Sequence, residues 1–231
     1  ISVQYILTSE NTLEMKYKAH LVEDASNPSP PPLCTPINLT NHTYWNLSGD
    51  LRDSVLNHHL HIPATRYTPY DTNQCIPTGE LADVKSTAFD FTNENGVLLK
   101  DRVPIIDGGG RTGIDHNWDV MGEVSPELLE GLHELPLRHA VTLSEACSGR
   151  RLTLHSTQPG CQVYTYNWAN ESAEHTESYK QSWPHVQHNG IALETQHFPN
   201  SINTPHFPSG HVLKPGAVYD QKSVLSFSVF N

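Results

Sequence analysis

Residues 1–21 read Ile1-Ser-Val-Gln-Tyr-Ile-Leu-Thr-Ser-Glu-Asn-Thr-Leu-Glu-Met-Lys-Tyr-Lys-Ala-His-Leu21. Two runs in this stretch alternate apolar and polar residues, and Ser9-Glu-Asn-Thr12 lies between them. A period of two places successive side chains on opposite faces of a β-strand, and small polar residues favour turns. The stretch therefore predicts a β-hairpin whose first run carries Ile1, Val3, Tyr5 and Leu7 and whose second run carries Leu13, Met15, Tyr17, Ala19 and Leu21.

The same period recurs along the chain. It is found in further runs at residues 59–62, 151–156, 161–168 and 224–230. Segments rich in Gly, Pro, Asn and Asp separate these runs, as turns would. Many short strands joined by turns predict an all-β protein, a large antiparallel β-sandwich. The length of 231 residues fits one such domain over residues 1–231.

Two segments depart from the strand pattern. The proline-rich segment Asn27–Leu33 cannot be interior helix or central strand, so we expect a surface connection there. Ser125–Leu135 has a capping serine, a proline in the first turn and leucines that share one face, which predicts a helix, although Gly131 weakens it.

The charge balance excludes several classes of partner. The chain has 14 Lys and Arg against 25 Asp and Glu, for a formal net charge of −11. Such a chain repels nucleic acids and anionic membranes, and the shortage of clustered cations argues against a strongly phosphorylated substrate. No apolar run approaches the roughly 20 residues that cross a bilayer. We therefore expect a soluble protein without a nucleic-acid or membrane partner.

The cysteines favour a reducing compartment. Cys34, Cys75, Cys147 and Cys161 are widely spaced and form no CxxC pair, so they predict neither a zinc knuckle nor a redox motif. The simplest interpretation is free buried thiols in the cytoplasm, with secretion left open.

Polar and aromatic residues gather in four segments. They are Pro36–Gly49, which contains His42, followed by Gly113–Trp118, Gln158–Tyr164 and Ile191–Gln196 with its sequel His197-Phe-Pro-Asn200. A titratable histidine among amides, hydroxyls and aromatic rings is a combination suited to binding a sugar.

The 15 histidines also raise the question of whether the chain binds a metal ion. In His58-His-Leu-His61, however, a strand sends His59 and His61 to one face and His58 to the other, so we expect no metal site.

In order and along nearly the whole chain, these segments resemble the aldose 1-epimerase (galactose mutarotase) family. The resemblance implies a β-sandwich of the galactose mutarotase type and acid–base interconversion of the anomers of a free aldohexose such as galactose or glucose. It implies no cofactor.

The resemblance also assigns roles to four residues. By itself His42 would be a buried histidine satisfied by its neighbours, and the family motif makes it the catalytic acid. Periodicity alone favours an exposed strand carboxylate at Glu194, and the L-E-T-Q motif makes it the general base. Asp115 could be a turn residue, whereas the resemblance implies that it holds substrate hydroxyls. Gln162 matches a further sugar contact.

Other residues of these segments receive no catalytic role. His116 could orient Asp115. Sugar rings favour aromatic platforms, although most aromatic residues in a sandwich belong to the core. We expect one or two pocket residues among Tyr44, Trp45, Trp118, Tyr164 and Trp168.

One part of the family pattern is missing. Family members carry an N-x-L-H-G-G motif, with a second sugar-binding histidine, upstream of the point that corresponds to Ile1. We therefore expect a partner chain or segment from the same precursor to supply it. The alternatives are a mutarotase of hexose 6-phosphates, which would need converging Lys or Arg residues, and a carbohydrate-binding relative or inactive fragment without turnover.

Overall fold

The computed structural model describes residues 1–22, 34–50, 53–71, 74–122, 135–169, 186–207 and 212–230. The proline-rich connection at 27–33 and the helix expected at 125–135, apart from Leu135, lie outside these residues. Among the helices of the described residues, none is long and apolar enough to cross a membrane.

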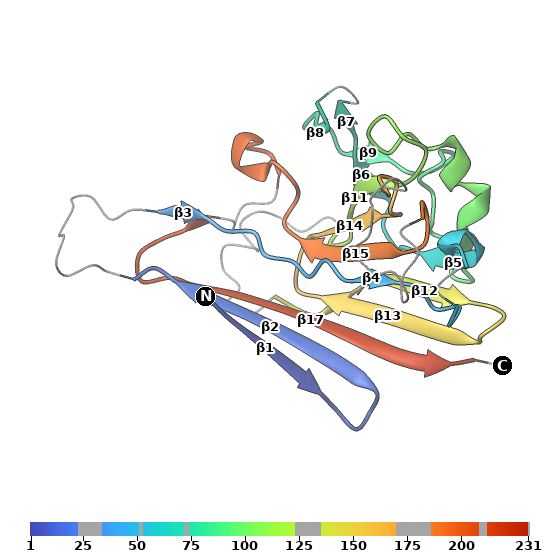
Figure 1. Cartoon of the computed structure of the whole chain (residues 1–231). Helices are drawn as coiled ribbons and strands as arrows, with labels where there is room; N and C mark the ends of the chain where they lie inside the picture. Colours follow the sequence, from blue (N-terminus) through green and yellow to red (C-terminus); the bar gives the residue numbers. More distant parts are fainter. Residues whose placement is uncertain are drawn as a thin grey trace, which may run out of the picture.

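Seven antiparallel strands form the larger sheet, which lies below the second sheet in Figure 1. In spatial order they are β1 (Ser2–Leu7), β2 (Thr12–His20), β17 (Val218–Val229), β13 (Arg150–Ser156), β12 (Arg138–Glu145), β5 (His58–His61) and β10 (Val97–Leu98).

Six strands form the second sheet, in the order β4 (Tyr44–Trp45), β15 (Ile191–Gln196), β14 (Gly160–Tyr164), β11 (Asp115–Asp119), β6 (Arg66–Thr68) and β9 (Ala82–Asp83). Two small ribbons, β16 (Val212–Leu213) with β3 (Thr35–Pro36) and β7 (Tyr70–Asp71) with β8 (Ile76–Pro77), complete the strands. Short 3₁₀ helices occupy Val55–Asn57, Leu99–Asp101, Val103–Ile105 and Ser201–Asn203.

The core lies between the two sheets. Alternate side chains of the larger sheet, such as Leu143 and Leu152, face Trp118 and Val163 of the second sheet, and all four are fully buried. The hydroxyls of Thr195 and Ser223 bridge the sheets at 2.9 Å. Because strand side chains alternate, the neighbours of these residues point outward, and on the second sheet those outward residues are mostly polar. The predicted all-β antiparallel sandwich is confirmed.

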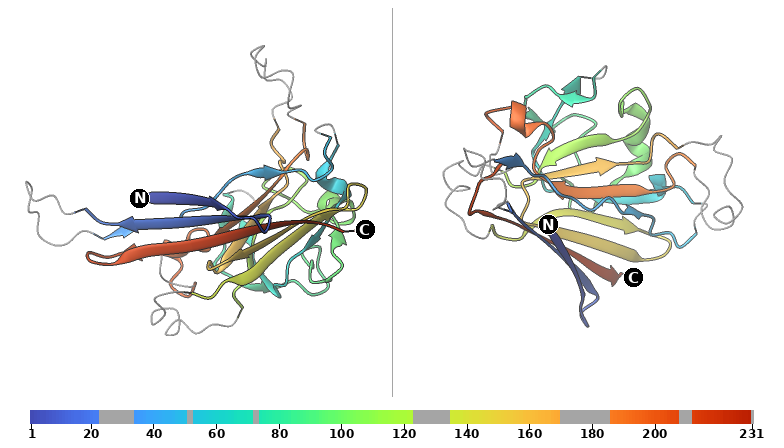
Figure 2. Two further views of the ribbon diagram at one scale, coloured as in Figure 1. Left: turned by 90° about the horizontal axis from the view of Figure 1, so that it is seen from below. Right: turned by 60° about the vertical axis from the view of Figure 1, so that its left-hand side comes forward.

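The hairpin predicted at residues 1–21 is also confirmed. Strands β1 and β2 pair antiparallel, with Val3 opposite Tyr17 and Leu7 opposite Leu13. Both views in Figure 2 show that this hairpin extends beyond the area that the second sheet covers. Strand β1 is therefore largely exposed, and 58% of Tyr5 is accessible to solvent.

The other runs were predicted with mixed success. Runs 59–62, 151–156 and 224–230 lie almost entirely within β5, β13 and β17. The strand predicted at 161–168 was wrong after Tyr164, where β14 ends. Tyr166 adopts a left-handed conformation with φ of 53°. Strand β12 was not expected, because the irregularity between His139 and Val141 interrupts its alternation.

All four cysteines are free thiols, but only Cys161 is buried. The expectation of buried thiols was therefore wrong for Cys34, Cys75 and Cys147, which are exposed. Burial raises the pKa of the Cys161 thiol to about 12, so it stays protonated at neutral pH.

Two buried histidines should make the stability of the fold sensitive to acid. Burial lowers the pKa of His58 to about 4 and that of His116 to about 3. The unfolded chain binds protons at these residues below about pH 6.5, whereas the folded chain does not. Each histidine should therefore lower the free energy of unfolding by up to about 1.4 kcal/mol per pH unit as the pH falls below 6.5, down to its folded-state pKa.

The contribution of His58 can be isolated by urea unfolding of wild type and of H58Q between pH 7.5 and 4.5. The free energy of unfolding should fall more steeply with acid in wild type than in H58Q. Equal slopes would contradict the assignment of a depressed pKa to His58.

Candidate active site

The outward face of the second sheet brings together the residues that the sequence singled out. Glu194 on β15 lies directly opposite Gln162 on β14. Asp115, at the start of β11, lies opposite Tyr164 of the same strand β14. Residues paired across antiparallel strands point to the same face, so these side chains share one surface although they come from three distant parts of the sequence.

His42 reaches this surface from the loop before β4. Its Nε2 lies 3.6 Å from Oε1 of Glu194, and its side chain is 53% exposed while that of Glu194 is 9% exposed. His42 is therefore not a buried core histidine, and Glu194 is not the exposed carboxylate that periodicity favours. The contact brings together an imidazole and a carboxylate that are far apart in the sequence.

The polar residues before His42 fix this loop against β15 and its sequel. The hydroxyl of Thr40 donates to the carbonyl of Thr195 at 3.2 Å. The Asn38 amide donates to the His197 carbonyl at 3.1 Å and accepts from the His197 N–H at 2.9 Å. These bonds join the N-L-T-N-H and L-E-T-Q-H segments directly, and the loop they hold brings His42 to Glu194.

Asp115 is a strand residue, not a turn residue. Nε2 of Gln162 donates a hydrogen bond to Oδ1 of Asp115 at 2.7 Å. This bond leaves the second carboxylate oxygen of Asp115 and the amide oxygen of Gln162 as acceptors for ligand hydroxyls.

Burial dominates the electrostatics of both carboxylates. It raises the pKa of Glu194, the negative charge of Asp115 raises it further, and the positive charge of His42 opposes the rise. Burial also raises the pKa of Asp115, against the hydrogen bond from Gln162 and the charge of His42. A carboxylate with a raised pKa is a stronger base once ionised, which suits proton abstraction.

A model of the family described as aldose 1-epimerase matches residues 1–226. The chain belongs to the aldose 1-epimerase family. It is 36% identical over 197 residues to galactose mutarotase of Homo sapiens, a match that covers 84% of this chain and 51% of the relative. It is 28% identical over 227 residues to aldose 1-epimerase of Escherichia coli, covering 98% of this chain and 58% of the relative. The chain thus spans about half the length of the curated relatives it matches.

Solved structures confirm the galactose mutarotase fold. An aldose epimerase homologue from C. elegans matches 99% of this chain and 59% of its own, with a TM-score of 0.74 and 24% identity. Galactose 1-epimerase from Lactobacillus acidophilus matches 99% of this chain and 57% of its own, with a TM-score of 0.65 and 23% identity. At these identities the likeness establishes the fold alone.

Two tyrosine rings lie beside His42. The ring centroids of Tyr44 and Tyr164 lie 5.1 and 6.4 Å from that of His42. Tyr166, which the sequence did not single out, packs on Tyr44 at 5.0 Å. The remaining candidates lie elsewhere: Trp45 packs on Phe227, Trp118 is fully buried, and Trp168 stacks beneath Arg111.

The other histidines take structural positions. Nδ1 of His116 accepts from the backbone N–H of Asp115 at 3.3 Å, so His116 contacts the backbone of Asp115 and packs on the Tyr70 ring at 4.5 Å. The predicted alternation at 58–61 is confirmed, because His58 is fully buried while His59 and His61 line one hollow on the outside of the larger sheet. Among the described residues, no three His, Cys, Asp or Glu side chains group in a way that could hold a metal ion.

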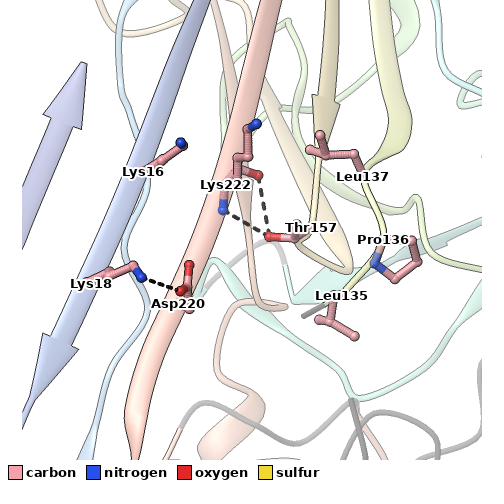
Figure 3. A pocket seen from close by; sticks show the side chains of 8 residues that line it. All are labelled: Lys16, Lys18, Leu135, Pro136, Leu137, Thr157, Asp220 and Lys222. Carbon is pink, nitrogen blue, oxygen red and sulfur yellow. Dashed lines mark hydrogen bonds and ion pairs between the residues drawn. The ribbon is translucent and has the colours of Figure 1, made fainter. Parts of the chain in front are cut away.

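A hollow of about 520 Å³ lies on the outside of the larger sheet (Figure 3). Lys16, Lys18 and Lys222 form one wall, and Leu135, Pro136 and Leu137 lie opposite. The ammonium groups already pair with carboxylates, Lys222 with Glu14 at 3.0 Å and Lys18 with Asp220 at 3.1 Å. The side chains of Lys222 and of the bridging Ser223 point to opposite faces of β17, so this hollow is on the far side of the sandwich from His42 and Glu194.

Three further residues border the site without having been singled out. Thr68, Tyr70 and Asn117 line a small hollow together with Asp115 and Gln162. Asn117 could have been found from the sequence, because it stands two positions after Asp115 in a strand and so shares its face. Thr68 and Tyr70 belong to short strands whose position depends on tertiary contacts.

Proposed function

We propose that the protein containing this chain is an aldose 1-epimerase that interconverts the α and β anomers of free hexoses such as galactose and glucose. The contact between His42 and Glu194, beside the Asp115–Gln162 pair, supports this proposal most strongly. An imidazole and a buried carboxylate at 3.6 Å can both reach the oxygens of one acetal carbon.

The reaction follows from these positions. Glu194, as a carboxylate, removes the proton of the C1 hydroxyl, while His42, as an imidazolium, protonates the ring oxygen. The C1–O5 bond breaks and the open-chain aldehyde forms. After rotation about the C1–C2 bond, O5 attacks the other face of the carbonyl. Glu194 then returns its proton to the C1 oxygen, and His42 recovers its own proton from the O5 hydroxyl.

Substrate orientation is assigned to Asp115 and Gln162. Their free oxygens accept hydrogen bonds from sugar hydroxyls, and a misplaced hydroxyl leaves a buried acceptor unpaired. Tyr44 and Tyr164 offer apolar ring surface beside His42.

Polarimetry tests this function. A freshly dissolved α-anomer of galactose should approach its equilibrium rotation faster in proportion to the concentration of the protein, with the same final rotation. An approach at the spontaneous rate, with sugar binding intact, would instead identify a carbohydrate-binding relative without turnover.

The pH dependence should reveal the buried base. Because the pKa of Glu194 is raised, its inactive protonated form persists to a higher pH than for an ordinary glutamate. We expect kcat/KM, after subtraction of the spontaneous rate, to fall with acid along a limb whose midpoint lies above 4.5. A rate that stays constant down to pH 4.5 would contradict Glu194 as the base.

The charges near the site favour a free hexose over a hexose 6-phosphate. Among the described residues, the hollow beside Asp115 and Gln162 has no Lys or Arg in its lining. Phosphate recognition commonly relies on such cations.

We also propose the cytoplasm as the compartment of this protein. The four unpaired cysteines support this proposal, because thiols stay reduced there.

A further inference from the structure

A small hollow of about 70 Å³ adjoins the candidate site, because Asp115 and Gln162 line it. Gln162 on β14 lies between Glu194 and the residues of β11, and Asp115 and Asn117 of β11 line the hollow together with Thr68 and Tyr70. Since a water molecule occupies about 30 Å³ of liquid, the hollow has room for a hydroxyl and its carbon but not for a second sugar ring.

Asn117 has an unsatisfied acceptor at this place. The residue is 1% exposed, and its Nδ2 donates to the hydroxyl of Thr68 at 3.4 Å. Its Oδ1 is buried and accepts no hydrogen bond from the described residues. Buried acceptors without a partner are rare and costly, so this oxygen calls for a donor other than the described residues, and a ligand hydroxyl can supply one.

The neighbouring strand keeps space for this amide. Gly160 lies on β14, and a Cβ added there would come within 2.4 Å of Oδ1 of Asn117. Only glycine at position 160 leaves room for this oxygen, in a residue that lines the hollow.

The strand register sets the distance of Asn117 from the reacting carbon. Glu194 lies opposite Gln162, and Gln162 lies opposite Asn117. Neighbouring strands are about 4.8 Å apart, which places Asn117 roughly 10 Å from Glu194 across the sheet. In a pyranose the C3–C4 bond lies opposite the C1–O5 bond, on which His42 and Glu194 are proposed to act.

We propose that Oδ1 of Asn117 accepts a hydrogen bond from a hydroxyl on the C3–C4 edge of the bound aldohexose. This inference rests on the proposed function for the orientation of the sugar. It makes Asn117 a specificity-determining residue, because the configuration and presence of that hydroxyl decide whether the buried acceptor is satisfied.

The test compares galactose with 3-deoxygalactose and 4-deoxygalactose by isothermal titration calorimetry on the full chain. Wild type should bind galactose about tenfold more tightly than one of the deoxy sugars. In N117A that preference should fall to within about twofold, whereas N57A, which changes an exposed asparagine outside the hollow, should keep it.

Binding is measured separately from turnover, so failure of this inference can be told from failure of the proposed function. Wild type that binds galactose and both deoxy sugars equally would overturn the role of Asn117, even if N117A does not fold. An undiminished preference in a folded N117A would overturn it too. Absence of galactose binding would overturn both proposals, whereas binding without turnover would overturn only the proposed function.

Discussion

Glu194→Gln should lower kcat for galactose mutarotation by about a thousandfold, within the range that general acid–base catalysis contributes. The amide has nearly the shape of the carboxylate and keeps a hydrogen-bond acceptor near the C1 hydroxyl, but it cannot take up the proton. Because Glu194 is buried and its neighbours are retained, galactose affinity should change by only a few-fold. Polarimetry gives the rate and calorimetry gives the affinity.

The matched control is Glu10→Gln, which neutralises an exposed glutamate at the hairpin turn. It should keep the wild-type rate, since it removes one negative charge far from the site. A rate for Glu194→Gln within tenfold of wild type would contradict the assignment of Glu194 as the base.

His42→Gln should lower kcat by roughly a hundredfold or more, because the amide cannot protonate the ring oxygen. Its side chain is half exposed, so the free energy of unfolding should change by only about 0.5 kcal/mol or less. The loss should therefore appear in kcat without loss of folded protein, as circular dichroism would show.

The double variant His42→Gln with Glu194→Gln tests whether the two residues act as a unit. Proton donation and removal occur in one ring-opening step, so the double variant should be nearly as fast as the slower single variant. Fully multiplicative losses would indicate that the residues act in separate steps. His20→Gln, at an exposed position at the end of β2, serves as the control.

The hairpin shows what alternation alone can predict. Its strands lie at the edge of the sheet, and their pattern follows from local polarity and the turn between them. Strand β12 could not be predicted in this way, because its irregularity at His139 shifts the period. The end of β14 could not be predicted either, since it depends on the left-handed conformation of Tyr166.

The sequence predicted the residues of the candidate site that belong to family motifs, but it did not predict which of them are buried. Family resemblance named His42, Asp115, Gln162 and Glu194, and the structure brings them to one face. Periodicity predicted the direction of Glu194 but not its burial or its contact with the loop that carries His42. Such a contact depends on Thr40 and Asn38 meeting a strand that is distant in the sequence. The expected partner segment from the same precursor stays a prediction.

The most direct test of the acid–base pair is a crystal structure of Glu194→Gln with bound galactose. We expect the C1 oxygen within hydrogen-bond distance of residue 194 and the ring oxygen next to Nε2 of His42. A sugar bound with its C1–O5 bond turned away from both residues, or bound elsewhere on the sandwich, would contradict it.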